Sequence, residues 1–184
     1  MSKVICLDAG HGFNFKTGKG DTGAVNGNHK ESVYALQITK KVSDILSKKG
    51  HKIILTRDGD YFVSLSDRCR ISNEKGANIF VSIHLNSAAN KSAYGVETFH
   101  HPNSSDMSKR IAGAVQKYLV RYTGDKDRGV KTADYFVLRN TKAKAILVEV
   151  GFISHDESAN KLATEDYQNK IAKAIADGII ELFG

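Results

Sequence analysis

Residues 4–12 read Val-Ile-Cys-Leu-Asp-Ala-Gly-His-Gly. The apolar run from Val4 to Leu7 is typical of a buried strand, and the glycines that follow it predict a turn. A histidine between two glycines stands in a flexible, wet turn and not in a packed core. His11 is therefore a candidate functional residue.

The same alternation of apolar runs and helical patterns continues along the chain. Apolar residues at helical spacing predict helices over 31–49, 104–122 and 165–182, the first ending before Gly50, and Ser64 is predicted to open a further helix over 64–75. Ser64, with Asp67 three residues later, resembles a helix N-cap. Residues 13–28 are rich in Gly, Asn, Lys and Thr and are predicted to be a long loop. Further strands are predicted over 51–56, 79–84, 95–100, 134–138 and 145–150.

Strands that alternate with helices predict an α/β fold with a mixed, mostly parallel sheet. The chain has 184 residues, and no repeat or change of composition marks an internal boundary. We therefore expect residues 1–184 to form a single domain. Cys6 lies in the apolar run and is predicted to be a buried free thiol, and no disulfide with Cys69 is expected.

The formal net charge is +7, which favours polyanionic partners such as nucleic acid, anionic membranes or phosphate-rich wall polymers. The alternative is a solvated surface with an excess of lysine. The lysines are scattered and are not interleaved with aromatic residues, so nucleic-acid binding is not predicted.

The N-terminus, Met1-Ser2-Lys3, runs directly into the first predicted strand and shows no apolar segment of a signal peptide. No window approaches about 18 uninterrupted apolar residues, so no membrane insertion is predicted. We expect a protein that acts where it is made, that leaves by another route, or that is a piece of a longer protein.

Three candidate side chains follow or end predicted strands, namely His11, His84 and Glu149. In open α/β sheets, sites form at the carboxyl ends of the strands. Glu149 is flanked by apolar residues, where an unpaired carboxylate is costly to bury, so it needs a partner or a function. His84 could equally be a hydrogen-bonded core histidine. Glu31 could equally be a first-turn residue favoured by the helix dipole.

Taken together, two imidazoles and one carboxylate are the usual protein ligands of a catalytic zinc ion. Zinc lowers the pKa of a bound water from about 15.7 towards about 7. A second carboxylate, whose pKa is raised by desolvation, can accept the proton and pass it to a leaving amine. The residues therefore predict attack of water on a polarised carbonyl, most naturally that of an amide. His29 could compete as a ligand, whereas His51, His100, His101 and His155 are not expected to bind the metal.

Several motifs in order resemble a known family. They are Leu7–Gly12 (LDAGHG), Gly23-Ala24, Glu31, Leu55–Arg57 (LTR), Leu65–Arg68 (LSDR), Phe80–Asn86 (FVSIHLN), Gly95–Glu97 (GVE), Val137–Arg139 (VLR) and Leu147–Ser154 (LVEVGFIS). The chain is similar, over about residues 3–183, to the zinc N-acetylmuramoyl-L-alanine amidases of the type 3 class.

This resemblance implies a mixed central sheet of about six strands with helices on both faces. It implies zinc ligands at His11, Glu31 and His84, and a catalytic glutamate at Glu149. It also implies cleavage of the amide between the lactyl group of N-acetylmuramic acid and L-alanine of the stem peptide in peptidoglycan.

The sequence departs from the family pattern at three places. The loop after the first histidine reads Phe13-Asn14-Phe15 and then Gly20–Ala24 (GDTGA), where a glycine and a DPGA stretch are usual. The late strand lacks a preceding proline, and His100 stands where an aromatic residue is common. None of these departures touches the four central residues.

We therefore expect a zinc amidase that acts at the bacterial cell wall, with peptidoglycan as substrate and anionic wall polymers as a further partner. A phage lysin released through a pore, or a bacterial autolysin freed by lysis, would fit the absence of a signal peptide. Two alternatives stay open on the residues alone. One is a non-catalytic wall-binding module, and the other is a zinc hydrolase for another amide, such as a deacetylase or peptidase.

Overall fold

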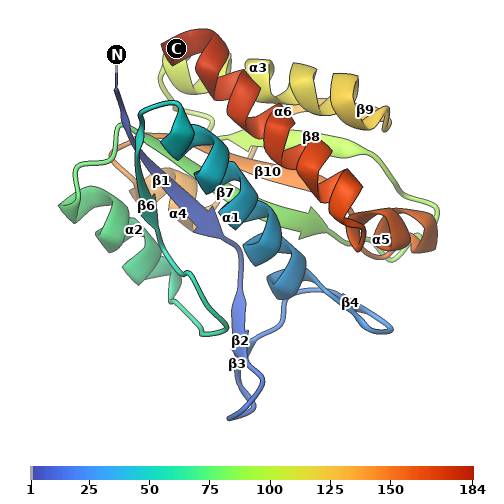
Figure 1. Cartoon of the computed structure of the whole chain (residues 1–184). Helices are drawn as coiled ribbons and strands as arrows, with labels where there is room; N and C mark the ends of the chain where they lie inside the picture. The colour runs from blue at the N-terminus through green and yellow to red at the C-terminus, as the bar shows by residue number, and fades with distance from the viewer. Residues whose placement is uncertain (1) are drawn as a thin grey trace.

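Six strands form one central sheet in the computed structural model, which describes residues 2–184 (Figure 1). The order is β6 (Lys52–Leu55), β1 (Val4–Ala9), β7 (Ile79–Asn86), β10 (Lys144–Phe152), β8 (Val96–His100) and β9 (Asp127–Thr132). All neighbours are parallel except β8 and β10. The predicted α/β fold with a mixed, mostly parallel sheet is confirmed.

Helices cover both faces of this sheet, but unequally. Helices α1 (Glu31–Lys48), α3 (Asp106–Thr123) and α6 (Glu165–Phe183) cover one face, where most of the buried apolar side chains gather. The short helix α5 (Asp156–Leu162) packs at the end of the same layer. The other face carries only α2 (Leu65–Glu74) and α4 (Phe136–Asn140) over a smaller core. This thinner layer leaves room for a pocket beside the ends of the strands.

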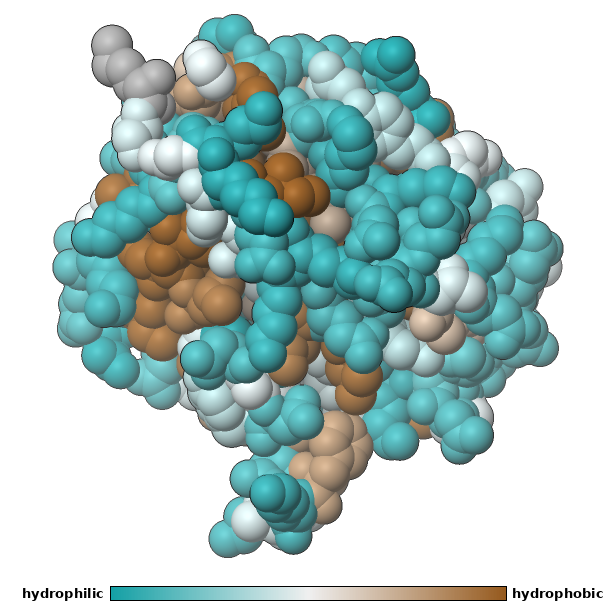
Figure 2. All heavy atoms as spheres, viewed as in Figure 1, coloured by the Kyte–Doolittle hydropathy of each residue, from teal (hydrophilic) through white to brown (hydrophobic). Residues whose placement is uncertain are grey.

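Strand alternation distributes side chains between the two cores. In β1, Ile5 and Leu7 pack under the three long helices, whereas Cys6 packs under α2 and α4. Cys6 is a buried free thiol, as predicted, and Cys69 is a buried free thiol as well. Seen from the side of α1 and α6, the outer surface is mostly hydrophilic, because these helices turn their apolar stripes inward (Figure 2).

Two predicted helix boundaries rest on local chemistry that the structure shows. The first helix ends at the cap residue Lys49, and Gly50 follows with φ of +83°, a conformation that favours glycine. The hydroxyl oxygen of Ser64 accepts a hydrogen bond from the amide of Asp67 at 3.1 Å and begins α2.

The strand predicted over 134–138 is wrong. Tyr135 caps the one-turn helix α4, whose Val137 and Leu138 pack into the smaller core. The sixth strand is β9, which reads Asp-Arg-Gly-Val-Lys-Thr. It lies at an edge and pairs only with β8, so it needs no apolar run, and its composition gives no strand signal.

The predicted loop over 13–28 contains two small hairpins. Strands β2 (Gly12–Asn14) and β3 (Lys19–Asp21) form one, and β4 (Val25–Asn26) and β5 (His29–Lys30) form the other. The hairpins carry the chain from the end of β1 to the start of α1. None of the helices within residues 2–184 is long and apolar enough to cross a membrane.

Candidate metal centre and active-site pocket

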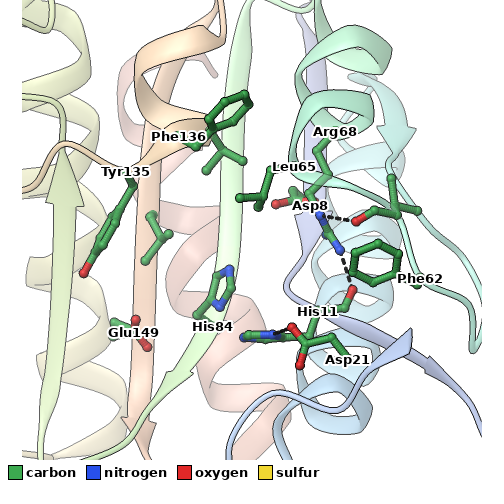
Figure 3. A pocket seen from close by; sticks show the side chains of 13 residues that line it. Asp8, His11, Asp21, Phe62, Leu65, Arg68, His84, Tyr135, Phe136 and Glu149 are labelled. Atoms are coloured by element: carbon green, nitrogen blue, oxygen red, sulfur yellow. Dashed lines mark hydrogen bonds and ion pairs between the residues drawn. The ribbon is translucent and has the colours of Figure 1, made fainter. Parts of the chain in front are cut away.

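The four candidate residues meet at the carboxyl end of the sheet. His11 follows β1, His84 lies in β7, and Glu149 lies in β10 directly opposite His84 in the strand register. Glu31 is the first residue of α1, which the hairpins bring back to the same edge. Figure 3 shows His11, His84 and Glu149 around one cavity. The parallel sheet thus brings together residues that are up to 138 positions apart in the chain.

Three of these side chains can bind one metal ion. Ligand atoms of His11, Glu31 and His84 all lie within 4.8 Å of one another, and no other such group occurs in residues 2–184. One carboxylate oxygen of Glu31 lies 3.1 Å from Nε2 of His11 and 2.9 Å from Nδ1 of His84. Two imidazole nitrogens and a carboxylate oxygen are the donor set of catalytic zinc sites.

The surrounding backbone fits such a centre closely. A Cβ atom on Gly10 would lie 2.4 Å from the imidazole ring of His84. A Cβ atom on Gly23 would lie 2.7 Å from both the carboxylate of Glu31 and the ring of His11. Only glycine leaves these side chains where they are, so the chain is shaped around the three ligands.

The main chain at His11 is itself unusual. Its φ is +57°, and it is the one non-glycine residue with a positive φ in the part of the chain that the structure describes. This conformation costs an L-residue about 1–2 kcal/mol, so surrounding contacts must hold it.

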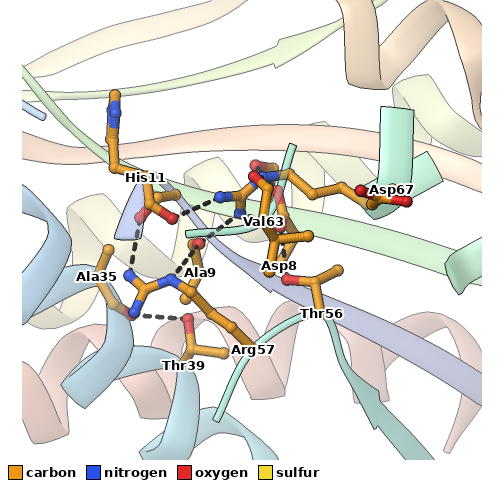
Figure 4. Close-up of polar contacts among 12 residues, drawn as sticks. Asp8, Ala9, His11, Ala35, Thr39, Thr56, Arg57, Val63 and Asp67 are labelled. Atoms are coloured by element: carbon orange, nitrogen blue, oxygen red, sulfur yellow. Dashed lines mark hydrogen bonds and ion pairs between the residues drawn. The ribbon is translucent and has the colours of Figure 1, made fainter. Parts of the chain in front are cut away.

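Two buried arginines supply those contacts (Figure 4). Arg57 donates to the carbonyl oxygens of Gly10 at 2.8 Å and of Ser32 at 2.7 Å, the residue after the ligand Glu31. Arg68 donates to the carbonyl oxygens of Ala9 and His11. The LTR and LSDR motifs therefore hold the backbone that carries two of the three ligands.

Asp8 balances part of this buried positive charge. Its carboxylate accepts hydrogen bonds from Arg68, Thr56 and Ser82, each at 2.6 Å. Burial alone would raise the pKa of Asp8, but the charge of Arg68 and the two hydroxyls hold that pKa below its ordinary value.

Asp21 is a site residue that the sequence analysis missed. Its carboxylate lies 2.6 Å from Nδ1 of His11 and accepts a hydrogen bond from the amide of Gly23. This contact turns Nε2 of His11 towards Glu31, in the way that carboxylates orient metal-binding histidines. Burial opposes the charged imidazole, but Glu31 and Asp21 raise the pKa of His11 to about 9. The one available signal was the position of Asp21 in the GDTGA segment.

Glu149 lies beside the three candidate ligands, and one of its carboxylate oxygens lacks a hydrogen-bond partner among the described residues. Its Oε2 atom is buried and has no hydrogen-bond partner within residues 2–184. Desolvation by this burial raises the pKa of the carboxyl to about 7. The sequence places this carboxylate among apolar neighbours, and the structure shows that it is buried there; its function stays a prediction.

Two of the candidate ligands, His11 and His84, border a cavity of about 490 Å³ together with Glu149. The rest of its wall is mostly apolar and comes from the segment at the start of α2, from α4 with Tyr135 before it, and from β10. The apolar lining residues are Phe62, Val63, Leu65, Tyr135, Phe136, Val137 and Leu147. Phe62 and Leu65 are about half exposed, at 52% and 55%. A cavity with a polar floor and an apolar wall can hold an extended amphipathic substrate.

The competing histidine, His29, is not part of the cluster. Its Nδ1 atom lies 2.8 Å from the hydroxyl of Tyr34. His51 accepts from the amide of Lys3, and His101 contacts Asp134. None of these three, nor His100 or His155, joins the group of ligands.

Comparisons with known proteins identify the family of the chain. The family described as N-acetylmuramoyl-L-alanine amidase, Amidase_3, matches residues 5–181. The chain is 40% identical to the endolysin of Bacillus phage SPP1, over 99% of this chain and 66% of that protein. It is 34% identical to the N-acetylmuramoyl-L-alanine amidase LytC of Bacillus subtilis, over 100% of this chain and 36% of that protein.

A solved structure gives the same result in three dimensions. The catalytic domain of the amidase CwlV from Paenibacillus polymyxa superposes with a TM-score of 0.90 at 37% identity, covering 98% of both chains. The sequence, the fold and the set of candidate ligands lead to one conclusion. The chain belongs to the Amidase_3 family of N-acetylmuramoyl-L-alanine amidases, whose reaction is the hydrolysis of an amide bond in peptidoglycan.

Proposed function

We propose that this chain hydrolyses the amide between the lactyl group of N-acetylmuramic acid and L-alanine, with zinc held by His11, Glu31 and His84. Glu149 is the general base and then the general acid. The observation that carries the proposal is the buried, partnerless oxygen of Glu149 opposite His84 in the register. A desolvated carboxyl beside a set of three metal ligands has the position that proton transfer requires.

When bound, zinc would polarise the amide carbonyl and lower the pKa of the attacking water. Glu149 removes a proton from that water and later delivers it to the alanine nitrogen as the bond breaks. A pKa of about 7 allows the same carboxyl to accept and to donate near neutral pH. Asp21 orients the ring of His11, and Arg57 and Arg68 hold its backbone.

Residues 1–184 are proposed to act as one catalytic domain at the bacterial cell wall, where peptidoglycan is found. The route by which the chain reaches the wall, and contact with anionic wall polymers, remain predictions from the sequence.

The test is digestion of purified peptidoglycan with and without a chelator. New alanine amino termini should form, and zinc removal should stop their formation. Glu149→Gln should retain zinc by metal analysis and lose activity about 10²–10⁴-fold. Turnover by Glu149→Gln at the wild-type rate would contradict the role of Glu149.

The same experiment separates the alternatives. Pelleting with cell walls without release of amino termini would identify a binding module. Release of acetate, or of amino termini other than alanine, would identify a zinc hydrolase for another bond.

A further inference from the structure

A second charged cluster lies beside Glu149, on the side away from the metal ligands. Its centre is Glu97 of β8, whose side chain is 5% exposed. The carboxylate accepts from Asn86 at 2.6 Å and from Nε of Arg128 at 2.8 Å, and it also contacts the ammonium of Lys131. The proposed reaction assigns no role to these four residues.

The cluster carries an excess of positive charge. One carboxylate faces two cations, so one positive charge stays uncompensated within the cluster. The side chains of Arg128 and Lys131 are 28% and 39% exposed, so both reach solvent. Arg128 uses only Nε on Glu97, which leaves the other guanidinium donors for an incoming group.

The strand register fixes where these cations lie. Glu149 pairs with His84 on one side and with Glu97 on the other, so the three side chains form a row on one face of the sheet. Lys131 of β9 pairs with Phe99 and therefore faces the same side as Glu97. Because both cations extend from β9 and contact Glu97 of β8, their charged ends lie between these two strands, about 5–7 Å from β10 in the plane of the sheet.

The substrate offers a group of matching charge at a matching distance. In a stem peptide whose second residue is D-glutamate linked through its side chain, the α-carboxylate is free. At about 3.5 Å of chain per residue, this carboxylate lies about 5–7 Å from the scissile nitrogen. A substrate whose amide sits between His84 and Glu149 can therefore place the carboxylate over β8.

We propose that Arg128 and Lys131, held in place by Glu97, form a subsite for the α-carboxylate of the second stem residue. The inference rests on the proposed amidase function, since that function places the scissile bond. Arginine and lysine donors to a carboxylate form charge-assisted hydrogen bonds, which are stronger than neutral ones. The subsite therefore selects stem peptides in which this α-carboxylate is free over stem peptides in which it is amidated.

The test uses two probe pairs that differ only in this group. Binding of the tripeptides L-Ala-γ-D-Glu-L-Lys and L-Ala-γ-D-isoGln-L-Lys to the zinc-loaded protein is measured by calorimetry. Hydrolysis of the corresponding N-acetylmuramoyl-tripeptides is followed in parallel. Wild type should favour the free carboxylate about tenfold or more in both measurements.

Arg128→Gln and Lys131→Gln each remove one cation and leave one for Glu97. Each substitution should bring the ratio of preference for the free carboxylate over the amide close to 1. The change should appear in KM and not in kcat. Lys170→Gln on α6, which removes a cation paired only with Asp166, is the matched control and should keep the wild-type preference.

Equal binding of the two tripeptides to wild type would overturn the subsite. A preference that both variants retain would overturn its assignment to Arg128 and Lys131. Because binding is read without hydrolysis, failure of the muramoyl probes to react while the binding preference holds would contradict the amidase function and leave the subsite standing.

Discussion

At the scale of single residues, the buried carboxyl of Glu149 couples the stability of the zinc-free protein to pH. Its pKa is about 7 in the folded state against 4.5 as the ordinary value. Between these values the folded state keeps the proton while the unfolded chain releases it. The folded state therefore binds more protons, and this group lowers the free energy of unfolding as pH rises from about 4.5 to 7.

Glu149→Gln removes this dependence. Relative to wild type, the variant should gain about 3 kcal/mol of stability between pH 4.5 and 8, because each pKa unit corresponds to about 1.36 kcal/mol. Urea unfolding of both proteins in chelator at several pH values gives the difference, in which the titrating groups that are not coupled to Glu149 cancel. A difference that stays constant with pH would show that Glu149 ionises normally.

Two glycines of one loop test the fit of the ligands. Gly23 and Gly27 have φ of +66° and +56°, so alanine is similarly strained at both, by about 1 kcal/mol. A Cβ on Gly23 would press on Glu31 and His11, whereas one on Gly27 would meet nothing within 4 Å. Gly23→Ala should therefore lose zinc affinity about tenfold or more, and Gly27→Ala should retain it, as measured by competition with a chromogenic chelator. Equal affinities would show that the loop does not shape the site.

The sequence alone predicted a site residue only where its immediate neighbours make an ordinary structural role unfavourable. His11 stands between two glycines, and Glu149 stands among apolar residues. Each of these two surroundings by itself indicates a functional role. Glu31 and His84 have ordinary alternatives, and only the family resemblance predicted them to be ligands. Asp21 was missed because its role depends on a hairpin that returns it to His11, which no local pattern shows.

At the scale of elements, the arginine pair connects β1, α1 and α2 to the turn that carries His11. Arg57 is 1% exposed and donates to carbonyl oxygens of Ala9, Gly10, Ser32 and Gly59. Arg57→Met should cost about 3–5 kcal/mol, because it leaves buried carbonyls without donors and Asp8 with less compensating charge. It should also weaken zinc binding, because the turn at His11 loses its support.

Arg70→Met is the control for this change. Arg70 lies on α2 and is 57% exposed, with only surface contacts to Asp67 and Glu74, so its loss should cost less than about 1 kcal/mol. Chemical denaturation of both variants, with metal titration, gives the comparison. Similar losses of stability in the two would argue that Arg57 acts as a surface residue does.

The elements that face a core on both sides were predictable, and the edge elements were not. Strands β1, β7 and β10 are buried on both faces and appear in the sequence as apolar runs. Strand β9 is polar and half exposed, and its pairing with β8 comes from the sheet and not from its own residues. The apolar residues of α4 were taken for a strand because four apolar positions do not separate a strand from one helical turn.

At the scale of the whole molecule, zinc would join three separate parts of the fold: the end of β1, the start of α1 and strand β7. A ligand that binds only the folded state stabilises it by about 4 kcal/mol at a thousand times its dissociation constant. The melting temperature should therefore fall by several degrees on chelation, as measured by scanning calorimetry. His84→Ala should melt at the same temperature with and without the chelator, and a shift in that variant would place the metal elsewhere.

The register of β10 between β7 and β8 has a consequence for when activity can arise during synthesis. All three ligands lie within the first 84 residues, whereas Glu149 is added only with the last central strand. A chain that ends before residue 144 contains all three candidate ligands but lacks the carboxyl to which the proposed mechanism assigns the proton transfer. A one-residue slip of β10 would turn Glu149 to the opposite face of the sheet. On the proposed mechanism, hydrolysis therefore depends on the pairing of β10 with both of its neighbours.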